Sequence, residues 1–117
     1  MSRLQPIVDE FIGTEDPEDT MLEILNVLQD SKVILPETGK YYTFVYLPKT
    51  VGIEYDEFPL IACMEIKRWV IKGFNYHWGK MRNYTWPEVV GEFHELMAGQ
   101  EVQDARSLSY AKFKLNT

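Results

Sequence analysis

Residues 41–48, YYTFVYLP, carry the clearest structural signal in the chain. Residues 41–47 are almost entirely β-branched or aromatic, which is typical of a β-strand, and Pro48 ends it. The same reasoning predicts strands at 60–66, at 68–78 with Gly73 as a bulge, at 81–84 and at 110–115. The chain beyond residue 40 is therefore expected to form a mainly antiparallel sheet.

The sequence ahead of this strand is acidic and helical. Residues 1–39 hold nine acids against Arg3 and Lys32, a net −7, whereas the rest of the chain holds nine acids and ten bases, a net +1. Apolar residues at helical spacing predict a helix from Leu4 to Phe11 that Gly13 ends. A second helix is expected from Asp16, as N-cap before Pro17, to about residue 31.

The region after the strands contains one further helix signal. Thr85-Trp86-Pro87-Glu88 reads as a capping box, and the apolar residues that follow fit one face of a helix ending at Gly99. A polar link then leads to the last strand. We therefore expect an α+β protein: a small antiparallel SH3-like β-barrel with one inserted helix, preceded by two short acidic N-terminal helices. The turn at 36–39 divides it into a helical segment, 1–38, and a β-rich barrel domain, 39–117.

Length and composition limit the classes of protein that fit. A chain of 117 residues, 45% of them hydrophobic, is long enough for one globular domain. Its single cysteine, Cys63, cannot form an intrachain disulfide and is expected to be a buried, inert thiol. No apolar run approaches the roughly 18 residues that cross a bilayer, and no signal peptide is evident, so no membrane partner is expected.

Residues 66–87 contain the most suggestive cluster of functional side chains. This stretch lacks acids and interleaves bases with aromatic residues, which is one pattern of a surface that binds unpaired bases. Its candidate binding residues are Trp69, Tyr76, His77, Trp78, Lys80 and Arg82. The alternative is that alternate aromatics fill the core of a small barrel and leave the bases as a solvated rim.

The loop at 49–59 adds Tyr55 and Asp56 as neighbouring candidates. Asp56 could serve as a general base with His77, although an acid at this position is more typical of a turn cap before Pro59. The sequence contains no phosphate loop, nucleophile elbow, dinucleotide fingerprint or zinc signature. We therefore expect no enzyme, no catalytic residues, no metal site and no cofactor.

Several strings in the sequence resemble a group of phage proteins. They are GKYYTFVYLPKT at 39–50, YDEFPL at 55–60, FNYHWG at 74–79, RNYTW at 82–86 and AKFKLN at 111–116. These strings resemble small proteins encoded by large contractile-tailed phages of marine bacteria, especially cyanophages. Some phage proteins that share the Tyr-Asp-x-x-Pro-Leu element are labelled as DNA end protectors. The resemblance implies action in the host cytoplasm or in the virion, and no catalytic residue is carried over from it.

Together these observations predict a phage-encoded, non-enzymatic accessory protein that binds a phage or host protein, or further copies of itself. The acidic helices would mediate assembly or contact the partner. One alternative is a DNA-binding protein that uses residues 66–87, including at DNA ends. Another is a small metal-dependent hydrolase or nuclease that uses Asp56 and His77.

Overall fold

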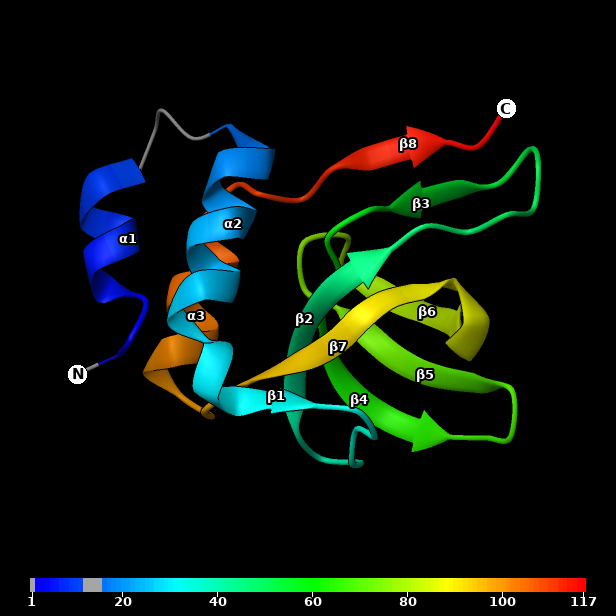
Figure 1. Cartoon of the computed structure of the whole chain (residues 1–117), viewed down its shortest axis with the longest axis horizontal. Coiled ribbons are helices and arrows are strands. Elements are labelled where there is room, and N and C mark those ends of the chain that lie inside the picture. Colours follow the sequence, from blue (N-terminus) through cyan, green and yellow to red (C-terminus); the bar gives the residue numbers. More distant parts are fainter. Residues whose placement is uncertain (1, 12–15) are drawn as a thin grey trace.

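The computed structural model describes residues 2–11 and 16–117, which form a mixed α+β fold (Figure 1). The helices are α1 (Gln5–Phe11), α2 (Pro17–Val27) and α3 (Gln100–Ser107), with 3-10 turns η1 (Gln29–Ser31) and η2 (Trp86–Glu88). The strands are β1 (Lys32–Val33), β2 (Tyr41–Tyr46), β3 (Glu54–Asp56), β4 (Leu60–Ile66), β5 (Val70–Asn75), β6 (Lys80–Thr85), β7 (Val89–Leu96) and β8 (Phe113–Leu115). None of these helices is long and apolar enough to cross a membrane.

Six strands form one sheet in the order β1-β7-β2-β4-β5-β6, and every neighbouring pair is antiparallel. The strand expected at 41–47 is β2, which lies inside the sheet between β7 and β4. The strands expected at 60–66 and 81–84 are present as β4 and β6. The sheet curves strongly, and its edges are β1 and β6 (Figure 1).

The sheet has a separate core on each face. The concave face encloses the aromatic core, formed by Tyr42, Phe44, Tyr46, Ile61, Cys63, Ile71, Tyr84 and Phe93. The other face packs on the three helices through the helical core, formed by Leu4, Ile7, Met21, Ile24, Leu28, Phe58, Leu60, Leu96, Val102, Ala105, Leu108 and Tyr110. Cys63 is buried in the aromatic core, as its apolar surroundings in the sequence predict.

The two acidic N-terminal helices are present; α2 lies beside the sheet, and α1 packs on α2 and α3 (Figure 1). The Asp16 carboxylate accepts hydrogen bonds from the backbone N–H groups of Glu18 (3.0 Å) and Asp19 (3.3 Å), and Pro17 is the first helical residue, as expected. Helix α2 ends at Val27, earlier than predicted, and η1 continues the chain. The expected stop of the first helix at Gly13 lies outside the described residues.

The helix predicted for residues 85–99 is wrong, because most of this segment is strand β7. Gly91 adopts a positive φ of 78° and lies where the β2–β7 register shifts. Phe93 belongs to the aromatic core and Leu96 to the helical core, so the spacing that imitates one face of a helix comes from a strand that is buried on both faces. The apparent capping box is also a different structure: the Thr85 hydroxyl donates to the Glu88 carboxylate, and only the single turn η2 follows.

Four other expectations differ from the structure. The loop at 49–59 contains β3, and the polar link after Gly99 contains α3. The last strand, β8, pairs with β3 in a separate two-stranded ribbon and does not close the main sheet. The bulge expected at Gly73 lies on β4 between Cys63 and Glu65, while Gly73 itself stays in register.

An ion pair between the half-buried Arg3 and the buried Glu101 anchors the N-terminal segment to α3. The Glu101 carboxylate is buried and accepts from Arg3 Nε at 2.8 Å, from Arg3 Nη2 at 2.6 Å and from the Met97 N–H at 2.9 Å. Burial by itself raises the pKa of Glu101, but the bonds from Arg3 and Met97 outweigh it and lower this pKa overall. Ionised Glu101 therefore stabilises the fold above the usual glutamate pKa, and this contribution is lost as the pH falls through the lowered value.

We predict that Arg3→Gln lowers the free energy of unfolding by about 2–3 kcal/mol, because it leaves a buried carboxylate without its cation. Urea denaturation followed by circular dichroism measures this change. The matched control is Lys40→Gln, which removes the exposed ion pair of Lys40 with Glu37 and should change stability little. Equal effects of the two variants would contradict the role given to Arg3.

Gly73 is required by the close approach of β4 to β5. A Cβ at this position would lie 2.7 Å from Cδ1 of Ile61, 3.0 Å from its Cβ and 3.2 Å from the Ala62 carbonyl oxygen. We predict that Gly73→Ala destabilises the protein by about 1–3 kcal/mol in urea denaturation. Adding Ile61→Val, which removes Cδ1, should recover part of this loss; strictly additive effects would contradict the proposed clash.

Candidate functional site

The structure divides the basic-aromatic segment 66–87 between two ends of a hairpin. Strands β5 and β6 pair from Val70 with Thr85 to Asn75 with Lys80. This register places Trp69 beside Trp86 at one end and the turn 76–79 at the other, about 17 Å away along the strands. The predicted binding residues therefore do not form one continuous surface.

At the turn end, Trp78 is covered by neighbouring side chains. The guanidinium carbon of Arg82 lies 3.9 Å and Lys80 Nζ lies 4.5 Å from its ring centroid, and the Phe113 ring lies 4.8 Å away. Arg82 also donates to the Glu54 carbonyl oxygen at 2.8 Å. Trp78 and Arg82 thus join the hairpin to the β3–β8 ribbon. The cation–π contacts of Lys80 and Arg82 leave little of the Trp78 ring for a nucleotide base.

Tyr76 and Tyr55 are also half-buried among neighbouring residues of the fold. The half-buried Tyr76 ring packs 6.3 Å from Tyr41 and 5.3 Å from Phe74, measured between ring centroids. Tyr55 is half-buried on β3, where it pairs with Lys114 of β8. Neither side chain lies at the Trp69 end of the hairpin.

Asp56 is buried, and its carboxylate accepts hydrogen bonds from three different segments. Its carboxylate accepts from the Phe58 N–H (3.1 Å), the Lys112 N–H (3.0 Å) and Asn75 Nδ2 (3.1 Å). The first of these bonds is the turn cap before Pro59 that the sequence suggests. Through these three bonds the carboxylate links the β3–β8 ribbon, the turn before Pro59 and β5, so its role is structural.

His77 connects the β5–β6 turn to the end of α3. Its Nε2 lies 3.2 Å from the Ala105 carbonyl oxygen and 3.0 Å from the Leu108 carbonyl oxygen, and its ring packs on Tyr110 at 4.8 Å. Burial lowers the pKa of His77, against the opposing charge of nearby Asp56. The geometry is that of a packed histidine that donates to backbone carbonyls.

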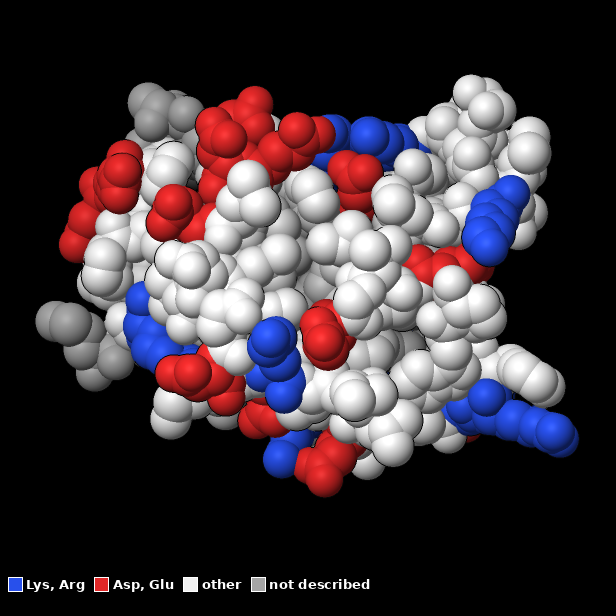
Figure 2. All heavy atoms as spheres, viewed as in Figure 1, with Lys and Arg blue, Asp and Glu red and all other residues white. Residues whose placement is uncertain are grey.

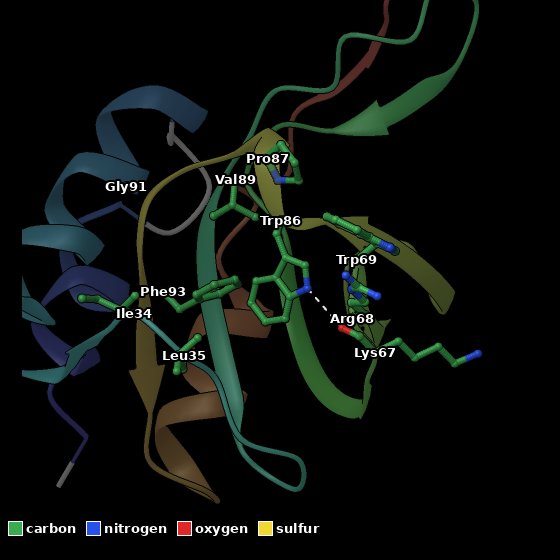
Figure 3. Close-up of a pocket in the computed structure, with 10 residues that line it drawn as sticks. All are labelled: Ile34, Leu35, Lys67, Arg68, Trp69, Trp86, Pro87, Val89, Gly91 and Phe93. Carbon is green, nitrogen blue, oxygen red and sulfur yellow. Dashed lines mark hydrogen bonds between the residues drawn. The ribbon is translucent and has the colours of Figure 1, made fainter.

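A hollow lies at the other end of the hairpin. It has a volume of about 570 Å³ and opens between the segment after β1 and the β4–β5 turn (Figure 3). We refer to it as the groove; its lining residues are Ile34, Leu35, Lys67, Arg68, Trp69, Trp86, Pro87, Val89, Gly91 and Phe93. Of the residues selected from the sequence, only Trp69 lines it.

The floor of the groove is rigid because it belongs to the aromatic core. Phe93 is buried and contacts Phe44 at 4.9 Å and Trp86 at 6.1 Å between ring centroids. The Trp86 indole N–H donates to the Lys67 carbonyl oxygen at 3.2 Å, so this ring is held in place (Figure 3). The groove is thus preformed and needs no rearrangement of the core to accept a ligand.

The rim of the groove exposes large apolar side chains to solvent. Ile34 is 79%, Leu35 is 74% and Trp69 is 67% exposed. Covering one such side chain completely is worth about 1.5–3 kcal/mol. A contiguous apolar rim around a hollow is the usual mark of a binding site.

Sequence reasoning located only part of the groove: segment 66–87 supplies Lys67, Arg68, Trp69, Trp86 and Pro87, whereas the other lining residues lie outside it. Ile34 and Leu35 lie more than thirty residues before Trp69. Their only local signal is an apolar run, Val33-Ile34-Leu35, placed after the helix and before Pro36. Trp86 and Pro87 lie within residues 85–88, the stretch that reads as a capping box.

A second, smaller hollow of about 230 Å³ lies beside β7 and is lined by His94 together with residues of α2 and η1. His94 is only 7% exposed, and neither ring nitrogen has a hydrogen-bond partner within the described part of the chain. Burial lowers the pKa of this histidine. No group of three or more His, Cys, Asp or Glu side chains among residues 2–11 and 16–117 could hold a metal ion.

Neither a protein-family model nor a curated protein nor a solved structure matches the chain.

The two histidines predict how stability depends on pH. Both have lowered pKa values in the folded protein, so the unfolded chain binds protons first, and stability falls as the pH drops below about 6.5. We predict that His94→Leu reduces this loss and leaves stability at pH 8 unchanged or higher, since its ring nitrogens have no partners to lose.

His77→Leu is the matched comparison. It should lower stability at pH 8 as well, because it removes the bond to the Ala105 and Leu108 carbonyl oxygens. Thermal unfolding at a series of pH values distinguishes the variants. The account of His94 fails if His94→Leu unfolds with the same pH dependence as the unchanged protein.

Proposed function

We propose that the protein acts by binding another protein through the groove, and that it is a non-enzymatic accessory protein of a phage, as its resemblance to cyanophage proteins implies. The observation that carries the proposal is the apolar rim of Ile34, Leu35 and Trp69 around a preformed hollow of about 570 Å³. A hollow of this size accepts a few large side chains of a partner. Buried aromatic and aliphatic anchors of this kind dominate the energy of protein–protein interfaces.

The scaffold that we propose for the groove is a partly open SH3-like barrel. Five strands, β7-β2-β4-β5-β6, curve around the aromatic core, and the short turn η2 leads directly from β6 to β7. Ring contacts cross the interior between Phe44 and Tyr84 (5.4 Å) and between Phe93 and Trp86 (6.1 Å). The groove then occupies the side on which the barrel stays open, where a partner would complete the apolar packing.

The chemistry of the rim supports a protein partner more than a nucleic acid. A single-stranded DNA surface needs several exposed aromatic faces along a basic track. In this structure Trp78 is packed under Arg82 and Lys80. Among the aromatic binding candidates of segment 66–87, Trp69 is the one that is largely exposed. Across the groove from Trp69 lie the aliphatic side chains of Ile34 and Leu35, which suit apolar side chains of a protein better than bases (Figure 3).

Selection from a random peptide library displayed on a surface tests this proposal. We expect the enriched peptides to share at least one large apolar residue and to bind Trp69→Ser at least about tenfold more weakly than the unchanged protein. The matched control is Met64→Ser, which changes an exposed apolar residue on β4 that does not line the groove. This variant should bind the same peptides with unchanged affinity.

Two outcomes contradict the proposal. One is a selection that enriches no peptide; the other is a set of peptides that bind both variants equally. Gel shifts with single-stranded, duplex and end-containing DNA form a parallel arm. The DNA-binding alternative would be favoured if the protein binds DNA, if this binding weakens steeply with salt, and if Arg68→Ala and Trp69→Ser abolish it.

A further inference from the structure

We propose that the partner in the groove is a second copy of this chain, which inserts Leu22 of its acidic helix α2. This inference rests on the proposed function, because it names the protein that the groove binds. It predicts that copies associate head to tail, since the groove and the helix are different surfaces of the molecule.

The helix offers an apolar side chain surrounded by acids. Leu22 is 64% exposed, while its neighbours Met21 and Ile24 are buried in the helical core. Asp19 lies one turn before Leu22 on the same side of the helix, and Glu23 follows it directly. Glu18 is on this surface as well and forms an ion pair with Lys112. Leu22 is therefore a largely exposed apolar residue with acidic neighbours.

The groove offers the complementary charge. Its ten lining residues include Lys67 and Arg68 and no acid (Figure 3). Arg68 lies 5.1 Å from the Trp69 ring centroid, and it forms no ion pair with any described residue. Lys67 approaches only the exposed Glu65, at 3.8 Å. Both cations are therefore placed beside the apolar rim and remain accessible to acids of another molecule.

The distribution of charge over the whole molecule agrees with this pairing. Acidic side chains gather over α1 and α2, at the upper left in Figure 2, whereas the cations of the groove lie in the β4–β5 turn. The helical segment carries nine acids against two bases and the remainder ten bases against nine acids. Opposite charge on the two surfaces would orient copies as they meet and accelerate association at low salt.

A contact between unlike surfaces leaves one groove and one helix unused in every pair. Further copies can then add at both ends, which gives a ring if the rotation closes and an open filament if it does not. The apolar part of the contact would set its strength, while the exposed ion pairs would make it sensitive to salt.

Sedimentation velocity over a range of protein concentrations tests the inference with two variants. Leu22→Arg disables the helix and leaves the groove intact, whereas Trp69→Glu disables the groove and leaves the helix intact. Both residues are largely exposed, so circular dichroism and thermal unfolding should show unchanged folds. The matched controls are Val51→Arg in the loop before β3 and Met64→Glu on β4, both at exposed apolar positions outside the groove and the helix.

The unchanged protein and both controls should increase in mass with concentration, and less so in high salt. Each single variant should remain monomeric, because it lacks one half of the contact. An equal mixture of the two variants should form dimers and nothing larger, since the intact groove of one fits the intact helix of the other.

Two results overturn the inference: an unchanged protein that stays monomeric at every concentration, and a mixture of variants that fails to associate although the unchanged protein does. A monomeric protein that still binds library peptides through Trp69 would leave the proposed function standing and assign the groove to a different protein. Loss of both self-association and peptide binding would remove the proposed function too.

Discussion

The whole fold depends on one strand that is buried on both faces. In β2, Tyr42, Phe44 and Tyr46 point into the aromatic core, while Thr43 points into the helical core. The Thr43 hydroxyl bonds to the Pro59 carbonyl oxygen at 2.9 Å and lies 3.1 Å from the Tyr110 hydroxyl. Because side chains of a strand alternate strictly, a shift by one residue would exchange the contents of both cores.

The two faces of the sheet are covered in different ways. Three helices cover the face that Thr43 occupies, and the ion pair of Arg3 with Glu101 holds the N-terminal helix against α3. The concave face closes mainly on itself, through edge-to-face packing of aromatic rings. Beyond Phe93 and Trp86 that packing stops, and the groove is the part of the concave face that no segment among the described residues covers.

The polar residues that suggest chemistry in the sequence are used mainly to join elements. Asp56 links the ribbon to β5 through Asn75, and Asn75 also donates to the Tyr84 hydroxyl at 3.2 Å. His77 links a turn to α3. Buried polar groups that are hydrogen-bonded hold neighbouring elements in a specific arrangement. This explains why carboxylate, amide and imidazole groups lie close together around Asp56 and His77 without forming an open site.

Local signals predicted local structure well. Asp16-Pro17 located the start of α2, and the β-branched and aromatic runs located β2 and β4. The failures occurred where a distant contact decides the outcome. Strand β7 is buried on both faces, with Phe93 in the aromatic core and Leu96 in the helical core, and this gives it a helical spacing. Helix α3 is held by the buried Glu101 carboxylate and Arg3, a contact that composition alone does not reveal.

The candidate site illustrates the same limit. An aromatic and basic cluster that is continuous in the sequence is separated by the β5–β6 hairpin, which sends Trp69 and Trp78 to opposite ends. The groove is assembled instead from Ile34, Leu35 and Trp69, which only the folded sheet brings together. Its apolar character was visible in the residue types, but its location depended on the topology.

The central claim is that the open side of the sheet is the surface through which the protein acts. The indole N–H signals of Trp69, Trp78 and Trp86 in a ¹H–¹⁵N spectrum test it directly, during titration with the tightest peptide from the library. The account predicts that the signal of the exposed Trp69 shifts most, that Trp86 follows, and that Trp78, packed under Arg82, stays in place. A titration that moves Trp78 and leaves Trp69 unchanged would contradict it.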